Sequence, residues 1–311
     1  MKNNEERLDN SEESWQLAHN FAYNFKVLPE RLSHVLRVLR KEYATKDEEA
    51  DISENCYMYM SGIDRFPALK VPLYFAASHL FPVRFKEAED DTSKAILKVL
   101  EPGMFSSLLV IFWFYRRIAK GVDSSLWSEY SKGIMLDMEL GYALGESLPG
   151  ISAADGILLA GVCQIAWGSL LIENSDGYVR YNNLHAGRIN LADEHKRFGC
   201  DHAQIATSLI LGLGMLEWRR GLPRRQLEPL ELRDIFLGRG HQNGLEDKWL
   251  RTCSKCIFML DQIKQDKFSM EELEKMGASK HARENLQQSI ANYFKGTPTF
   301  TWINKGLKEV D

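Results

Sequence analysis

The sequence predicts an all-α protein, because apolar residues recur at helical spacing along most of the chain. Alternating runs of β-branched residues, which are typical of strands, are almost absent. The composition is that of an ordinary globular protein, with 44% hydrophobic and 26% charged residues among 311. This balance favours a sizeable apolar core and disfavours an intrinsically disordered chain.

The first half of the chain predicts a tail followed by five helices. Residues 1–14 are polar and acidic, and we expect a mobile tail there. Apolar residues on one face predict a first helix over residues 15–43. Short helices are expected over 55–62, 66–78 and 92–100, and Pro102-Gly103 separates them from an aromatic helix over 104–120.

The second half continues the helical pattern. An amphipathic helix over 126–148 precedes a strongly apolar helix over 153–172, and Ser152 and Asp155 predict that this apolar helix begins with a capping box. Segment 177–199 is typical of broken helix. Further helices are expected over 202–218, 230–236, 246–265, 270–276 and 280–294.

Charge and cysteine usage exclude several classes of protein. The net charge is −4 and no basic stripe runs along the chain, so nucleic acid is not an expected partner. The polar start lacks the order of a secretory signal. The longest uncharged apolar stretch, 156–172, is slightly too short to span a membrane and contains Gln164. Five cysteines form no secreted framework. We therefore expect a cytoplasmic protein without a membrane partner.

Three segments, in order along the chain, carry a family resemblance. The first comprises FPALKVPLYFAASHLF at 66–81 and SKAILKVLEPG at 93–103, and the second is GILLAGVCQIAWGSLLI at 156–172. The third and most specific is EHKRFGCDHAQIATSLILGLGM at 194–215. The third segment matches at Glu194, Phe198, Gly199, Asp201, His202, Ala203 and Leu209 without a gap. Together the segments resemble the HDOD family, whose members are related to HD phosphohydrolases.

The resemblance implies a multi-helical HD-like fold with two helical sub-lobes. We expect the N-terminal sub-lobe over residues 15–122 and the HD-like core over 123–265. Residues 266–311 would form a C-terminal helical extension.

The resemblance also locates the residues that would bind metal in an active HD enzyme. The His-Asp pair of such enzymes would lie in the second segment, where this chain has Gln164-Ile165. Tyr130 and Ser131 occupy an earlier position where an enzyme would have histidine. Divalent cations that polarise phosphoryl groups need imidazole and carboxylate ligands. We therefore expect no catalytic residue, no metal and no other cofactor.

A ligand site or a residual divalent-metal site remains as a hypothesis. Its candidate residues are Glu194, His195, Asp201, His202, His241 and Gln164. The position of Asp201 and His202 at the start of a helix favours a structural role, in which Asp201 caps the helix and His202 hydrogen-bonds across the core.

Two further motifs contain residues that bind phosphate or metal in other proteins. Arg219, Arg220, Arg224 and Arg225 flank Pro223, and their guanidinium groups are candidates for binding phosphate. Cys253 and Cys256 form a CxxC motif, but they lie within a predicted helix without a second pair. We expect them to be buried thiols and not zinc ligands.

The leading functional interpretation is a non-catalytic regulatory protein. The resemblance implies a role in bacterial signal transduction, with a signalling protein as partner and a cyclic nucleotide as a candidate ligand. The alternative is a metal-dependent phosphohydrolase with a rearranged site around Asp201, His202 and His241. A third hypothesis is small-molecule sensing in a pocket between the lobes.

Overall fold

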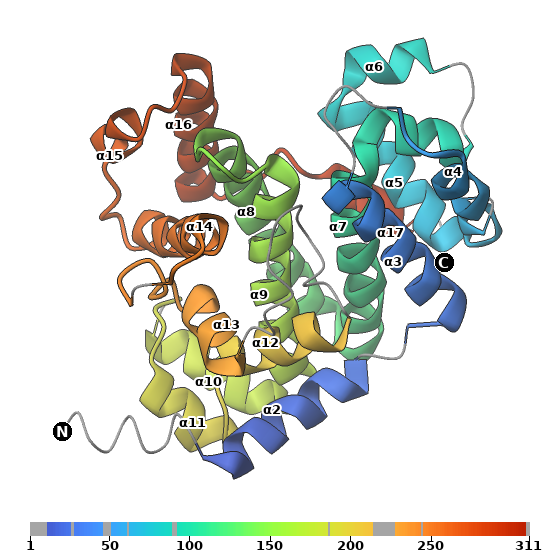
Figure 1. Cartoon of the computed structure of the whole chain (residues 1–311). Helices are drawn as coiled ribbons and strands as arrows, with labels where there is room; N and C mark the ends of the chain where they lie inside the picture. The colour runs from blue at the N-terminus through green and yellow to red at the C-terminus, as the bar shows by residue number, and fades with distance from the viewer. Residues whose placement is uncertain are drawn as a thin grey trace.

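The computed structural model describes residues 11–25, 28–45, 51–60, 62–88, 92–185, 187–213, 228–243 and 245–308. Within these ranges the chain forms helices and no strands, which confirms the predicted all-α class (Figure 1). The helices of the first half are α2 (Glu12–Phe25), α3 (Glu30–Thr45), α4 (Glu54–Met60), the 3₁₀ turn η1 (Ile63–Arg65), α5 (Pro67–Leu80), α6 (Pro82–Glu87) and α7 (Ser93–Gly121).

Except for the last of them, the helices of the second half follow the sequence pattern closely, and residues 214–218 of the helix predicted over 202–218 lie outside the described residues. These helices are α8 (Ser124–Ser147), α9 (Ala153–Glu173), α10 (Ser175–His185), α11 (Leu191–Phe198), α12 (His202–Gly212), α13 (Pro229–Phe236), α14 (Lys248–Lys264), α15 (Met270–Lys275), α16 (Lys280–Lys295) and α17 (Trp302–Lys308). The predicted capping box at the start of α9 is confirmed, because Ser152 and Asp155 bond reciprocally to each other's backbone amides.

The first predicted helix is wrong in two respects. The segment forms two helices, α2 and α3. Pro29 lies directly before α3, and a proline disfavours helical backbone at the residue that precedes it. Helix α2 also begins at Glu12, inside the segment expected to be a tail, and Ser14 on its inner face is buried. The predicted break at Pro102-Gly103 corresponds to a kink within α7, where Glu101 has a φ of 62°.

Two groups of helices flank the long helices α7, α8 and α9. In Figure 1, α3, α4, α5, α6 and α17 gather on one side of α7, while α14, α15 and α16 lie on the other side of the molecule. Helix α17, which the apolar pattern had not predicted, packs on α5, and its Trp302 is among the largest fully buried side chains. Helix α2 packs on α12 and α9. The first and last helices that the structure describes, α2 and α17, therefore each pack against a segment distant in sequence.

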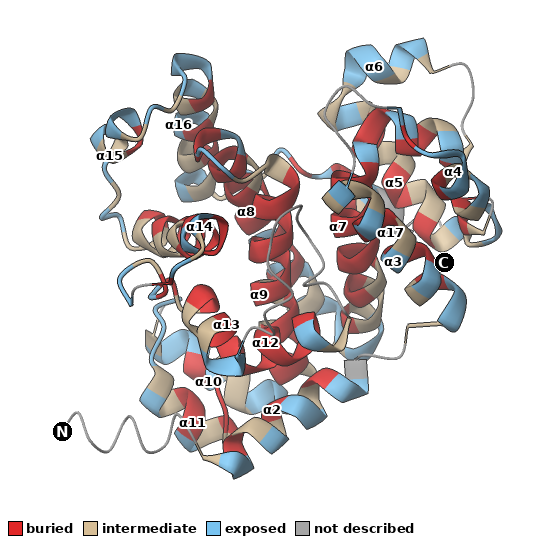
Figure 2. Ribbon diagram, viewed as in Figure 1, coloured by how far each residue is buried: buried red, intermediate tan, exposed pale blue. Residues whose placement is uncertain are grey.

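Helices α8 and α9 form the closest pair in the core. Gly141 and Gly145 of α8 face Gly156 and Ser152 at the start of α9, and a Cβ atom added to any of these glycines would collide with the facing backbone. Helix α7 packs on another face of α9, where Ile111 and Ile118 lie against Gly161 and Gly168, and both helices are largely buried (Figure 2). This close crossing fixes the position of the α9 residues that line the candidate site.

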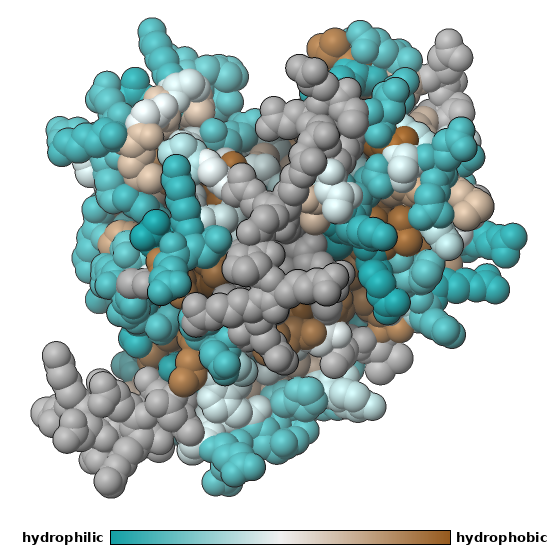
Figure 3. Space-filling model, viewed as in Figure 1, coloured by the Kyte–Doolittle hydropathy of each residue, from teal (hydrophilic) through white to brown (hydrophobic). Residues whose placement is uncertain are grey.

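Two helices of the described chain, α7 and α9, are long and apolar enough to cross a membrane by length and composition. In each of them 83% of the most apolar window is buried inside the protein, as in the core helices of soluble proteins. The face in Figure 3 is largely hydrophilic, with hydrophobic residues in scattered patches. All five cysteines are free and buried, and Cys253 and Cys256 lie on α14 as expected for buried thiols.

Candidate functional site

The start of α12 is built by a glycine turn and a second capping box. Gly199 ends α11 with a φ of 77°, a left-handed conformation that glycine adopts without steric cost. Asp201 then caps α12 by accepting a hydrogen bond from the backbone N–H of Gln204 at 2.8 Å. The Gln204 side chain accepts in return from the backbone N–H of Asp201 at 3.1 Å. The predicted capping role of Asp201 is confirmed.

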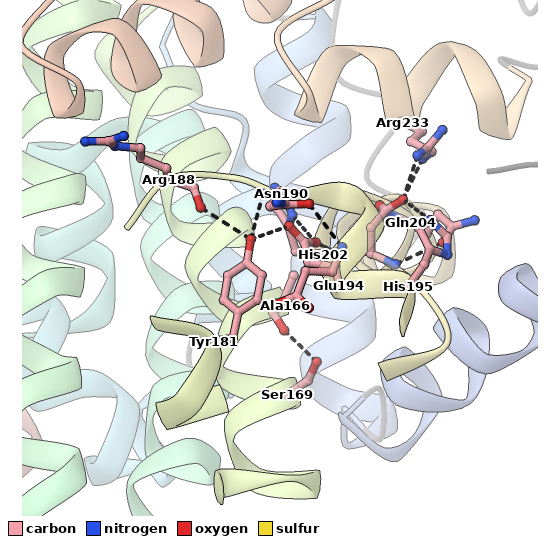
Figure 4. Close-up of polar contacts among 12 residues, drawn as sticks. Ala166, Ser169, Tyr181, Arg188, Asn190, Glu194, His195, His202, Gln204 and Arg233 are labelled. Carbon is pink, nitrogen blue, oxygen red and sulfur yellow. Dashed lines mark hydrogen bonds and ion pairs between the residues drawn. The ribbon is translucent and has the colours of Figure 1, made fainter. Parts of the chain in front are cut away.

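Asp201 also forms a buried network with two other side chains, Arg233 and His195, which are labelled in Figure 4. Arg233 of α13 donates to Oδ2 of Asp201 from Nη2 at 2.6 Å and from Nε at 3.0 Å. His195 Nε2 lies 3.0 Å from the same oxygen. Burial alone would raise the pKa of Asp201, but His195 and Arg233 outweigh burial and hold it well below its usual range. The carboxylate is therefore ionised and already satisfied by protein groups.

His202 pairs with Glu194 next to this network. The imidazole Nδ1 lies 2.8 Å from Oε2 of Glu194, and the backbone N–H of His202 donates to the same oxygen at 3.0 Å. Tyr181 donates its hydroxyl to Oε1 of Glu194 at 2.9 Å. Burial lowers the pKa of His202, but the carboxylates of Glu194 and Asp201 outweigh burial, so the pKa lies above its ordinary value.

The His202 ring stacks on Trp167 of α9, with the ring centroids 4.7 Å apart and the planes 15° from parallel. From α2, Ser14 donates to Gln204 at 2.8 Å and lies 3.4 Å from His195 Nδ1. The first helix therefore completes the cluster. Residues Ser14, Trp167, Tyr181 and Arg233 had not been identified from the sequence, because each comes from a different helix and no local motif marks any of them.

A cavity of about 600 Å³ lies beside this cluster, between α8, α9, α10, α14 and α16, and we call it the Lys264 cavity. His202 and Trp167 form part of its wall. At its base Gln164 donates its side-chain N–H to Oδ2 of Asp137, and the ammonium of Lys264 pairs with that same oxygen. Burial lowers the pKa of Lys264, but Asp137 outweighs burial and raises it. The side chain of Lys264 is therefore positively charged near neutral pH, and it lies beside the side chain of Gln164.

Aromatic rings make up much of the remaining wall. Trp167, Tyr130, Tyr178, Tyr181 and Tyr293 all line the Lys264 cavity. Burial raises the pKa of Tyr178 and of Tyr130, so both phenols are neutral donors or acceptors near neutral pH. The cavity therefore offers ring faces together with a few polar groups, which is typical of sites for small organic ligands.

The structure divides the candidate residues into three groups. Glu194, His195, Asp201 and His202 lie together, whereas Gln164 points into the Lys264 cavity toward Asp137. His241 has other partners: its ring packs on Phe258 at a centroid distance of 4.8 Å, and its backbone N–H donates to Ser254. Arg219, Arg220, Arg224 and Arg225, the candidates for phosphate binding, lie outside the described residues.

The donor set of the site does not fit a divalent cation. In the described part of the chain, no group of three or more His, Cys, Asp or Glu residues is arranged to hold a metal ion. The carboxylates of Glu194 and Asp201 already bind histidine and arginine, and Asp137 binds the ammonium of Lys264. A metal would have to displace these partners and lie next to their positive charges.

Comparison with known proteins supports the fold alone. No family model and no curated protein matches the chain. A crystal structure described as "Putative phosphohydrolase from Shewanella amazonensis SB2B" superimposes with a TM-score of 0.54. The match covers 94% of this chain and 98% of that one, at 13% sequence identity. The two chains share a fold. This likeness supports the HD-like fold expected from the sequence.

Proposed function

We propose that the protein is a non-catalytic HDOD-type regulatory protein that binds a small organic ligand in the Lys264 cavity. The observation that carries this proposal is the pairing of Asp137 with both Gln164 and Lys264. In an enzyme of the resembled family, the Gln164-Ile165 position would supply two metal ligands. Here it supplies an amide that donates to the buried carboxylate of Asp137, and the ammonium of Lys264 neutralises that carboxylate.

The Lys264 cavity favours a planar ligand. Its volume of about 600 Å³ lies within the range of small-molecule sites, and its aromatic side chains can stack on a ring. Glu129, Asp137 and Asp261 line it together with Lys264 and Arg188, so carboxylates outnumber cationic side chains by one and a phosphate group is less well matched to this cavity than an uncharged ring. The cyclic nucleotide expected from the sequence therefore remains a candidate ligand to be tested against an uncharged nucleoside.

The wider biological role is part of the same proposal. A ligand that orders the walls of the cavity would change the exposed faces of α10 and α16, and a signalling protein that binds those faces would respond. We propose that this exchange takes place in the bacterial cytoplasm, with neither nucleic acid nor membrane as a partner. The net charge of −4 and the burial of α7 and α9 support the last two points.

The alternative, a metal-dependent phosphohydrolase built on Asp201, His202 and His241, has no geometric support among the described residues. Asp201 and His202 bond to other partners in two separate pairs. His241 packs on Phe258, and burial lowers its pKa. No observation in the described structure therefore favours this function over ligand binding.

Turnover and ligand binding can be tested on the same preparation. With Mn²⁺ or Mg²⁺ added, the full chain is expected to hydrolyse neither bis(p-nitrophenyl) phosphate nor cyclic di-GMP. Adenosine, cyclic AMP and cyclic di-GMP are then compared by thermal shift, and a ligand of the cavity is expected to raise the melting temperature. Turnover that is lost in Asp137→Asn would contradict the proposal.

A matched pair of tyrosine variants locates the ligand. Tyr178→Ala removes a ring from the Lys264 cavity, whereas Tyr23→Ala removes an exposed ring from α2. The thermal shift is expected to disappear in the first variant and to persist in the second. A shift that persists in both variants would place the ligand elsewhere.

A further inference from the structure

A second cavity, of about 590 Å³, lies between α7, α8 and the segment that precedes and begins α17. We call it the Lys120 cavity. Arg116 and Lys120 reach it from α7, and Lys132 reaches it from α8. Pro298 and Asn304 of the C-terminal segment form its opposite wall. None of these residues takes part in the site described above.

The lining of the Lys120 cavity is cationic. It includes Arg116, Lys120 and Lys132, and no Asp or Glu is among the described residues that line it. Within the described ranges, neither Lys120 nor Lys132 has a carboxylate partner. The Lys264 cavity, by contrast, includes three carboxylates. In a chain of net charge −4, three cations around one cavity create a local potential that attracts anions.

Helix α8 supplies hydroxyl and amide donors to the same space. Ser124, in its first turn, and Ser128, one turn later, both line the cavity. The N-cap residue Asp123 makes no side-chain capping hydrogen bond, so the first backbone N–H groups of α8 have no side-chain cap. The positive end of the helix dipole thus adds to the charge of the lysines.

An aromatic side chain and several apolar ones complete the wall. Trp127 lines the cavity, and Met135 and Ala119 add apolar surface. Positive groups, hydroxyl donors and an indole in one cavity of this size match a small molecule that carries both an anionic group and a ring. Lysine and a helix N-terminus are common binding groups for phosphate.

We propose that the Lys120 cavity binds a small phosphorylated organic molecule, at a site separate from the Lys264 cavity. The two cavities lie on opposite faces of α8. Ser128, Ser131, Lys132 and Met135 line one face, and Glu129, Tyr130, Gly133 and Asp137 line the other. This assignment holds whether or not the Lys264 cavity binds a ligand of its own.

Phenylphosphonate is the probe, because it carries a ring and a phosphate-like group but cannot be hydrolysed at a P–O ester bond. Calorimetric titration of the full chain is expected to show one binding site that weakens as ionic strength rises. Phenol, which has the ring without the anion, is expected not to displace phenylphosphonate, whether or not phenol binds in the Lys264 cavity. Absence of phenylphosphonate binding at millimolar concentration, or its displacement by an equal concentration of phenol, would overturn the proposal.

A double lysine substitution tests the location. Lys120→Met with Lys132→Met is expected to weaken phenylphosphonate binding roughly a hundredfold, about tenfold for each charged contact removed. The control is Lys94→Met with Lys98→Met, which makes the same charge change at exposed positions on the first half of α7. All four lysines are exposed or at the cavity surface, so both variants are expected to fold, as melting curves will verify. Equal weakening in the control, or none in the cavity variant, would overturn the assignment.

Discussion

Asp137 has a buried side chain on α8 whose partners define the chemistry of the Lys264 cavity. Its oxygen Oδ2, which could otherwise bind a metal ion, instead accepts hydrogen bonds from the amide of Gln164 and the ammonium of Lys264. The sequence identified Gln164 as a replaced metal ligand, because its position follows from the family resemblance. It did not identify Asp137 or Lys264, because residues 27 and 100 positions away from Gln164 meet it only through tertiary packing.

The Asp201–Arg233 pair gives a prediction about stability. Arg233→Met removes the two guanidinium hydrogen bonds and leaves the carboxylate buried with His195. Loss of one partner of a buried pair costs about 3–5 kcal/mol, and we expect the free energy of unfolding to fall by about 3 kcal/mol. Chemical denaturation measures this change. The double variant Asp201→Asn with Arg233→Met is expected to recover part of the loss, and a single variant as stable as the wild type would contradict the geometry.

The His202–Glu194 pair gives a prediction about pH. Because the pKa of His202 is higher in the folded chain than in the unfolded chain, the folded state retains the proton over a range of pH above about 6.5. Its stabilisation is complete below that value and is lost as pH rises through the folded pKa. The free energy of unfolding should decline there by up to about 1.4 kcal/mol per pH unit.

Replacing the imidazole tests that assignment. In His202→Gln the decline between about pH 6.5 and the folded pKa is expected to flatten, because the titrating group is gone. His79→Gln is a suitable control, since His79 is a histidine of α5 outside the cluster. If the pH dependence survives unchanged in His202→Gln, another group is responsible.

At the scale of elements, local motifs were predicted correctly and distant contacts were not. The capping boxes at Ser152 and Asp201 are each contained within four residues, so the sequence alone specifies them. The break between α2 and α3 and the helix α17 were missed. The apolar pattern continues from 15 to 43 across Pro29, so the sequence indicated one helix there, and α17 is only seven residues long.

The close crossing of α8 and α9 gives a prediction for which another glycine of α8 is the control. Gly156→Ala would place a Cβ against the backbone of Gly141, so the helices must move apart, and we expect a loss of about 1–3 kcal/mol, the usual cost of overpacking. Gly133→Ala on α8 has nothing within 4 Å of the added Cβ and should stabilise by about 0.5–1 kcal/mol through helix propensity. Melting curves of the two variants test the interface. If both changes have the same sign, the crossing is not as close as described.

At the scale of the whole molecule, the sequence predicted the all-α class and the resemblance to the HD-like fold. It did not predict which distant segments pack together. Helix α2 completes the cluster around Asp201 through Ser14, although the sequence places Ser14 in a tail. The C-terminal segment returns across α8, where Glu139 accepts hydrogen bonds from Asn292 and from the backbone N–H of Thr299, both at 2.7 Å. Contacts of this kind join residues about 150–190 positions apart, and no local pattern specifies them.

The metal content of the purified protein tests directly whether the paired carboxylates of this protein can hold a metal ion. The chain is produced in medium supplemented with manganese, iron and zinc, and bound metal is measured by mass spectrometry. No stoichiometric metal is expected, because Lys264 neutralises Asp137 and the carboxylates near His202 are already paired. One or two ions per chain, lost in Asp137→Asn or His202→Ala, would contradict this expectation.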